Sequence, residues 1–131
     1  VELVAVGEPA PAGVLVVAGS DAGNIGTFHG PAILRELELL VEAGLTPAQA
    51  LRAATLDAAE AFGKGGELGS VEAGKLADLV VLDASPLADV RNLARVRVVV
   101  KDGVPHTPEE ILAPTAAERA QRAENAAKLR D

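Results

Sequence analysis

Hydrophobic residues in the first half of the chain follow two different patterns. An apolar run without polar alternation covers Val14–Ala18, which is typical of a strand buried on both faces of a parallel sheet. Apolar residues then recur every three or four positions over Pro31–Ala43, which predicts a helix that stops at Gly44. Thr46–Gln49 has the sequence of a capping box with proline at the first helical position, and it predicts a second helix that continues to about Phe62.

The pattern changes at Lys64, beyond which glycines separate short apolar segments. Leu79–Leu82 and Val96–Val100 have the length and the β-branched composition of buried strands. Asp102-Gly103 is a typical hairpin turn, so we expect a return strand from Val104. Short strands with tight turns that follow helices predict a second, all-β layer.

Two further capping boxes lie near the C-terminus, at Thr107–Glu110 and Thr115–Glu118. The second begins a predicted helix that runs to about Leu129. Because Leu129 is the only large apolar residue of that segment, we expect the helix to lie on the surface.

The segment Gly19–Gly23 directly follows the first apolar run and presents one carboxylate, Asp21. At the C-terminal end of a buried parallel strand, beside glycines that allow close approach, such an acid can bind a metal ion or accept a proton. A turn aspartate that caps the next backbone amides has the same local sequence. Residue types alone leave both interpretations open and favour the turn.

Taken in order, the motifs resemble the last barrel strand and following helices of the amidohydrolase superfamily, most of all its imidazolonepropionase-like and prolidase-like branch. The likeness covers roughly residues 12 to 104. It is carried by Ala12–Gly23, His29-Gly30, Glu36-Leu37, Gly44–Pro47, Ala53–Thr55, Leu68–Asp83 and Val100–Gly103. Each motif is loose alone, whereas their order and spacing together are specific.

This resemblance implies an α/β fold, made of the last strand and helices of a (β/α)8 TIM-type barrel, part of a small β-sandwich domain and a C-terminal helix. The expected divisions are 1–63 for the barrel part, 64–106 for the β domain and 107–131 for the helical tail. The chain contains no Met. We therefore interpret it as a piece of a longer protein, although a processed or engineered product would lack Met too.

The resemblance also implies a metal-dependent hydrolase of C–N bonds that acts on a small-molecule amide, cyclic amide or dipeptide. In that family the residue at the position of Asp21 is a metal ligand and proton acceptor. His29 would lie in the loop above the site and contact substrate, although bracing the following helix is an equally good interpretation. The expected cofactor of the intact enzyme is a divalent metal, zinc by preference.

The family's other ligands have no counterpart in this chain: a His-x-His pair, a Lys or Glu, and two further histidines. Because catalytic zinc needs three protein ligands, we expect the chain alone to hold no metal tightly and to be inactive. Its expected partners are then the remainder of the barrel or another copy of the chain. The alternative is a non-catalytic structural or interaction module. A small-ligand binding protein has only the glycine-rich loop in its favour.

Other chemistry-bearing residues give weaker signals. Asp78 and Asp83 bracket a predicted strand and could act as paired carboxylates, although capping the strand ends is the favoured interpretation. Gly63–Gly66 lacks the spacing of a phosphate-binding loop. His106 stands alone and is expected to be exposed.

Composition excludes some function classes. A net charge of −7, with 2% aromatic residues and neither Tyr nor Trp, argues against nucleic-acid binding. No apolar run approaches the roughly 20 residues of a membrane helix, and no signal peptide is visible. The absence of cysteine rules out a disulfide and a thiolate site, and fits a cytoplasmic location.

Overall fold

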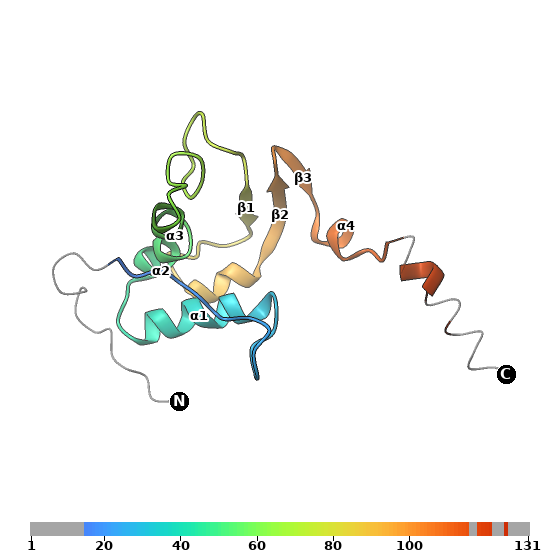
Figure 1. Ribbon diagram of the computed structural model, residues 1–131, viewed down its shortest axis with the longest axis horizontal. Coiled ribbons are helices and arrows are strands. Elements are labelled where there is room, and N and C mark those ends of the chain that lie inside the picture. The colour runs from blue at the N-terminus through green and yellow to red at the C-terminus, as the bar shows by residue number, and fades with distance from the viewer. Residues whose placement is uncertain (1–14, 116–117, 122–124, 126–131) are drawn as a thin grey trace.

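The computed structural model describes residues 15–115, 118–121 and 125, and within them the fold is α/β. A small sheet follows the helices α1 (Pro31–Glu42), α2 (Pro47–Ala53) and α3 (Leu56–Ala61), and α4 (Pro108–Leu112) comes after the sheet. In Figure 1 the first three helices and the sheet form one body, from which α4 and the described residues beyond it extend away. No helix in these ranges is both long enough and apolar enough to cross a bilayer.

The apolar run predicted as a buried strand pairs with no other strand in the described part of the chain. Residues 15–20 are without regular structure, and the Ala18 N–H donates instead to the Ala53 carbonyl at 3.0 Å. Leu15 and Val17 are 48% and 41% exposed. A strand buried on both faces needs sheet neighbours and cover on each side, which the described residues do not supply. The predicted strand over Val14–Ala18 is therefore not formed among the described residues 15–18, and residue 14 lies outside them.

The core is small and lies between α1, α2 and the short 3₁₀ helix η1 (Val90–Ala94). Its buried residues are Leu37, Ala50 and Val90, one from each element. The second helix is rich in alanine, which lets α1 approach it closely. Partly buried Ala18, Leu40, Val41, Ala54 and Leu93 surround this cluster. The predicted helix from Pro31 is confirmed, and its amphipathic face forms this core.

The predicted second helix is two helices. Its capping box is confirmed, since Thr46 Oγ1 accepts from the Gln49 N–H and the Gln49 side chain accepts from the Thr46 N–H. The helix does not run unbroken to Phe62, however, because it breaks at Thr55, whose φ and ψ are −127° and −93°. The Thr55 hydroxyl donates to the Leu51 carbonyl at 2.8 Å, a back-bond that competes with helical hydrogen bonding.

The sheet has three antiparallel strands in the order β1 (Leu79–Leu82), β2 (Val96–Lys101), β3 (Val104–His106). All three strands were predicted. Asp102 and Gly103 have φ of 50° and 80°, and two positive φ values are the signature of the type I′ hairpin turn that the sequence predicts. The sheet is a single small layer. In Figure 1 its strands lie apart from residues 15–20, which we call the extended segment.

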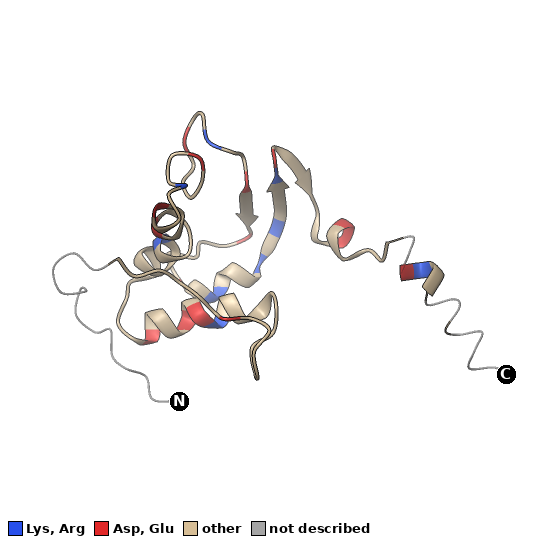
Figure 2. Cartoon of the chain, viewed as in Figure 1, with Lys and Arg blue, Asp and Glu red and all other residues tan. Residues whose placement is uncertain are grey.

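Acidic residues fix both ends of β1. The Asp78 carboxylate accepts from the Asp102 N–H at 2.8 Å and from Lys101 Nζ at 3.0 Å. These contacts hold the pKa of Asp78 below its ordinary value, and the hydrogen bond from the Asp102 N–H has the largest effect. At the other end Asp83 accepts from Arg97 Nε at 2.6 Å. The strand-end interpretation of Asp78 and Asp83 is confirmed. Figure 2 shows basic positions along β2, the strand that holds both of their cationic partners.

The C-terminal capping boxes are also confirmed. Thr107 and Glu110 exchange side-chain to backbone hydrogen bonds at the start of α4, at 2.8 and 3.2 Å. Thr115 and Glu118 make the same reciprocal pair at 2.7 and 3.2 Å. The predicted continuation toward Leu129 lies outside the described residues.

Candidate functional site

Asp21 and His29 lie in one loop, residues 19–30, which joins the extended segment to α1. In Figure 1 it is the blue loop that projects beyond α1. The loop closes on itself, because the Asp21 carbonyl accepts from the Thr27 hydroxyl at 2.9 Å and the Gly23 N–H donates to the Thr27 carbonyl at 3.0 Å. The candidate site is therefore a compact surface turn at the start of a helix.

The Asp21 backbone is left-handed, with φ of 45°. Aspartate and asparagine adopt this conformation more readily than other residues with a side chain. Its carboxylate is exposed, and Oδ2 accepts from Asn24 Nδ2 at 3.0 Å. Asp21 is thus a turn residue, as its residue type suggests, and the hydrogen bond from Asn24 uses its Oδ2 atom and not Oδ1.

The His29 ring folds back toward the start of the loop. A Cβ at Gly23 would lie 3.1 Å from His29 Nε2, so the imidazole rests directly against this glycine. Gly23 also has φ of 105°, which a residue with a side chain rarely adopts. Glycine at this position therefore lets the His29 ring pack against the backbone at Gly23, two residues after Asp21 in the sequence.

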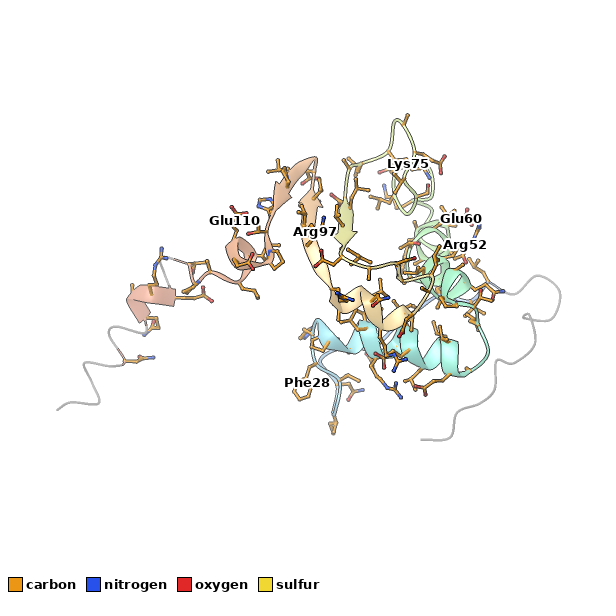
Figure 3. The ribbon with its side chains drawn as sticks, turned by 180° about the vertical axis from the view of Figure 1, so that it is seen from behind. Phe28, Arg52, Glu60, Lys75, Arg97 and Glu110 are labelled. Carbon is orange, nitrogen blue, oxygen red and sulfur yellow. The ribbon has the colours of Figure 1, made fainter. Side chains whose placement is uncertain are left out.

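Asn24, Thr27 and Phe28 take part in the site and were not singled out from the sequence. Asn24 and Thr27 hold the loop closed through hydrogen bonds to Asp21 and to each other. The Asp-x-x-Asn spacing of Asp21 and Asn24 was the sequence signal that could have predicted this turn. Phe28, labelled in Figure 3, is 76% exposed, and Ile25 is fully exposed.

A catalytic metal needs more ligands than this loop offers. Across the described ranges, no three His, Cys, Asp or Glu side chains lie close enough to hold one ion. Catalytic zinc takes three protein ligands. The carboxylate of Asp21 fits the role of one such ligand, and the described residues alone do not form a metal site.

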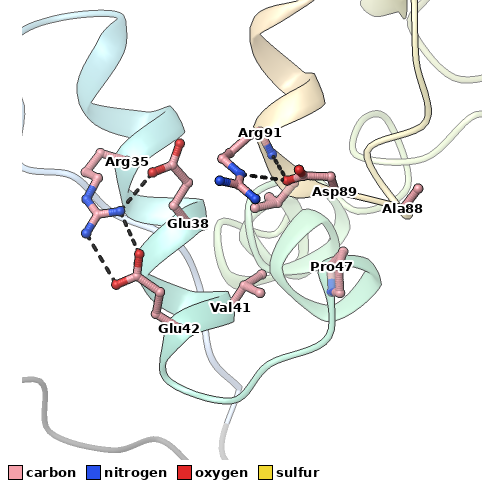
Figure 4. A pocket seen from close by; sticks show the side chains of 9 residues that line it. Arg35, Glu38, Val41, Glu42, Pro47, Ala88, Asp89 and Arg91 are labelled. Carbon is pink, nitrogen blue, oxygen red and sulfur yellow. Dashed lines mark hydrogen bonds and ion pairs between the residues drawn. The ribbon is translucent and has the colours of Figure 1, made fainter.

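A second candidate is the groove of about 520 Å³ between α1 and η1, shown in Figure 4. Arg35 Nη1 lies 2.8 Å from both Glu38 and Glu42, and Arg91 Nε lies 3.0 Å from Asp89. The hydrogen bonds to Glu42 and Glu38 raise the pKa of Arg35, and the bond to Glu42 has the larger effect. Because each arginine is paired with a carboxylate and the three carboxylates outnumber the two arginines, these residues offer no free cation to bind an anionic ligand.

A third candidate surrounds Lys75 in the loop between α3 and β1 (Figure 3). The mostly buried ammonium of Lys75 donates to the Gly65 carbonyl at 2.7 Å and to Ser70 Oγ, and it pairs with Glu72 at 3.2 Å. Ser70 also donates to Glu72. This hydrogen bond has the largest effect in lowering the pKa of Glu72, and the hydrogen bond from Lys75 has the next largest. A Ser–Lys pair can act in nucleophilic catalysis, but all three N–H donors of Lys75 serve to close the loop.

A sequence model described as the Amidohydrolase family matches residues 4–105. The chain belongs to the amidohydrolase family. This amidohydrolase chain is 43% identical over 72 residues to an imidazolonepropionase of Symbiobacterium thermophilum, covering 53% of the chain and 16% of that relative. It is 45% identical over 64 residues to an N-substituted formamide deformylase of Arthrobacter pascens, covering 46% of the chain and 12% of the relative.

Solved structures give the same family. The amidohydrolase chain superposes on a Xaa-Pro dipeptidase with bound methionine in its active site, with a TM-score of 0.63 and 37% identity. The match covers 68% of this chain and 21% of the solved one. The resemblance to the imidazolonepropionase-like and prolidase-like branch is confirmed, and the chain spans only a small part of the length of these relatives.

Proposed function

We propose that this chain supplies Asp21 to the active site of a metal-dependent amidohydrolase that hydrolyses C–N bonds. Family membership and the names of the relatives support this, since a formamide deformylase and a Xaa-Pro dipeptidase are named for removing a formyl group and cleaving a dipeptide. The proposed substrate is a small amide, cyclic amide or dipeptide.

In this proposal residues 1–63 are the C-terminal part of the barrel, 64–106 part of the small β domain and 107–131 a helical tail. The extended segment 15–20 then belongs to the last barrel strand. Its lack of strand partners among the described residues agrees with a strand whose neighbours lie in the rest of the protein.

The observation that carries the proposal is the placement of Asp21, an exposed carboxylate on a glycine-rich loop that leads from an extended segment into a helix. A divalent metal in such a site, zinc by our expectation, lowers the pKa of a water molecule. Asp21 would give that metal one ligand, and other parts of the protein would give the rest. Because Asn24 holds Oδ2, the carboxylate is oriented, and it can accept a proton at an oxygen atom.

The test is hydrolysis by the intact protein of a cyclic amide, an Xaa–amino-acid dipeptide and an N-formyl amine. We expect turnover of at least one of these three classes, with release of a free carboxylate. Purified, metal-loaded protein that cleaves none of them would contradict the proposal.

For His29 we expect a role in substrate binding. His29→Ala in the intact enzyme should raise KM, with a smaller effect on kcat than a change at Asp21, because uniform substrate binding alters KM alone. Steady-state kinetics with His106→Ala as the matched control tests this, since His106 lies on β3. A fall in kcat as large as that from Asp21→Asn would place His29 in the chemistry instead.

Among the described residues the ligand set is incomplete, which favours a second function for the chain when it stands alone, that of a non-catalytic module. We expect the isolated chain to lose zinc on dialysis and to show no hydrolysis. Near-stoichiometric zinc retained by the pure chain, measured by elemental analysis, would contradict this.

A further inference from the structure

The carboxylate of Asp21 is restrained by a neighbouring side chain. Asn24 Nδ2 donates to Asp21 Oδ2 at 3.0 Å. The last torsion of an aspartate side chain is broad, so its two oxygens have no strongly preferred direction of their own. A donor that binds one oxygen limits this rotation. Carboxylates that bind metal ions in proteins are commonly hydrogen-bonded by a neighbouring group in this way.

The Asn24 amide is itself oriented. Its Oδ1 atom accepts from the Ile25 N–H at 2.8 Å. An asparagine amide carries one acceptor oxygen and one donor nitrogen on the same carbon, whereas a charged carboxylate can only accept. The bond at Oδ1 therefore leaves the nitrogen to face Asp21, which is the pairing that an ionised carboxylate requires.

The backbone that carries both side chains is closed by Thr27. The Thr27 hydroxyl donates to the Asp21 carbonyl at 2.9 Å and also lies 3.1 Å from the Asn24 carbonyl oxygen. The Thr27 N–H donates to the Asn24 carbonyl at 3.1 Å, and the Asn24 N–H donates to the Asp21 carbonyl at 3.3 Å. Each of these bonds joins residues between 21 and 27, so the frame that holds the two side chains is local to this loop.

Asn24 has two roles that rest on different atoms. The turn uses its backbone and its Oδ1 atom, and the Asp21 carboxylate uses its Nδ2 atom. An asparagine needed only for the turn would be replaceable by aspartate, which has an oxygen at the same position and is also a common turn residue. Substitution can therefore separate a role in the turn from a role toward Asp21.

We propose that Asn24 is a positioning residue, whose Nδ2 holds the Asp21 carboxylate in the orientation in which Asp21 binds the metal and accepts a proton. This inference rests on the proposed function of Asp21. Asn24 acts through Asp21 and is assigned no contact with the substrate. Loss of a group that hydrogen-bonds a metal ligand lowers metal affinity or activity by about 10–100-fold, and we expect an effect of this size.

Steady-state kinetics of Asn24→Asp in the intact enzyme tests the proposal. This variant keeps an acceptor for the Ile25 N–H but has no N–H for Asp21. We expect kcat to fall by about 10–100-fold with KM nearly unchanged, because the orientation of Asp21 matters for the chemical step. Asn92→Asp is the matched control and should keep native kcat, because the Asn92 amide donates to the Ser85 carbonyl in another part of the fold.

A double-mutant cycle separates this role from a general effect on the fold. When Asp21→Asn is already present, Asn24→Asp should cause no further loss of kcat, because both changes act on the same group. An equal further loss in that background would overturn the proposal. Native kcat in Asn24→Asp beside an impaired Asp21→Asn would overturn it too, and would leave the role of Asp21 standing. Native kcat in Asp21→Asn would overturn the role of Asp21 together with this inference.

Zinc affinity gives a measurement that does not depend on turnover. Competition with a chromophoric chelator measures the Kd of the intact protein for zinc. Here Asn24→Ala is the variant, since an added carboxylate could itself bind zinc. We expect its Kd to rise by about 10–100-fold, while Asn92→Ala keeps the native value. Native zinc affinity in Asn24→Ala would overturn the proposal.

Discussion

Replacing Asp21 with asparagine in the intact enzyme is expected to lower kcat by about 10²–10⁴-fold, the usual contribution of a general base. Asparagine keeps an oxygen that can bind a metal ion, and it tolerates the left-handed backbone at this position, where φ is 45°. It cannot accept a proton from water near neutral pH. The expected loss is therefore chemical and leaves the fold intact.

Steady-state kinetics and circular dichroism of the same preparation measure this effect. Asp83→Asn is the matched control, because Asp83 is an acid bonded to Arg97 at the end of β1. It should retain nearly native kcat. Native kcat in Asp21→Asn would remove Asp21 from the mechanism.

Gly69→Ala is expected to destabilise the fold by about 2–4 kcal/mol. Gly69 has φ of 90°, and a Cβ there would lie 2.7 Å from Leu56 Cα, 2.9 Å from Ala59 Cβ and 3.0 Å from the Thr55 carbonyl. These atoms belong to α3 and to the break before it, so none can move as a flexible side chain would. The methyl group must displace the helix or the loop.

Denaturant unfolding at one fixed protein concentration measures the difference. Gly66→Ala is the control, because a Cβ at Gly66 meets nothing within 4 Å. It should change the free energy of unfolding by less than about 1 kcal/mol. Equal stability of the Gly69→Ala and Gly66→Ala variants would mean that the loop does not pack on α3 as described.

Local signals predicted much of the secondary structure correctly. The capping box at Thr46 and the Asp102-Gly103 turn act within a few residues, so their hydrogen bonds and φ values follow from sequence alone. The strand over Val14–Ala18 was predicted from hydrophobicity, which indicates burial only if neighbouring strands are present. The break at Thr55 was missed because it depends on a side-chain bond to Leu51 that the alanine-rich pattern does not reveal.

The candidate site was predicted only in part. Asp21 and His29 were singled out by their family motifs, and the structure places them in the same loop. The packing of the His29 ring against Gly23 depends on the positive φ of that glycine and on its lack of a side chain, which no spacing rule predicts. The Lys75 cluster was missed, since residues ten positions apart meet there only after the loop has folded.

The most direct measurement is the metal dependence of hydrolysis by the intact protein. Dialysis against a chelator should abolish turnover of its amide substrate, and added zinc should restore it in the native protein but not in Asp21→Asn. Full activity in protein that elemental analysis shows to be free of metal would contradict a metal-dependent site to which Asp21 contributes.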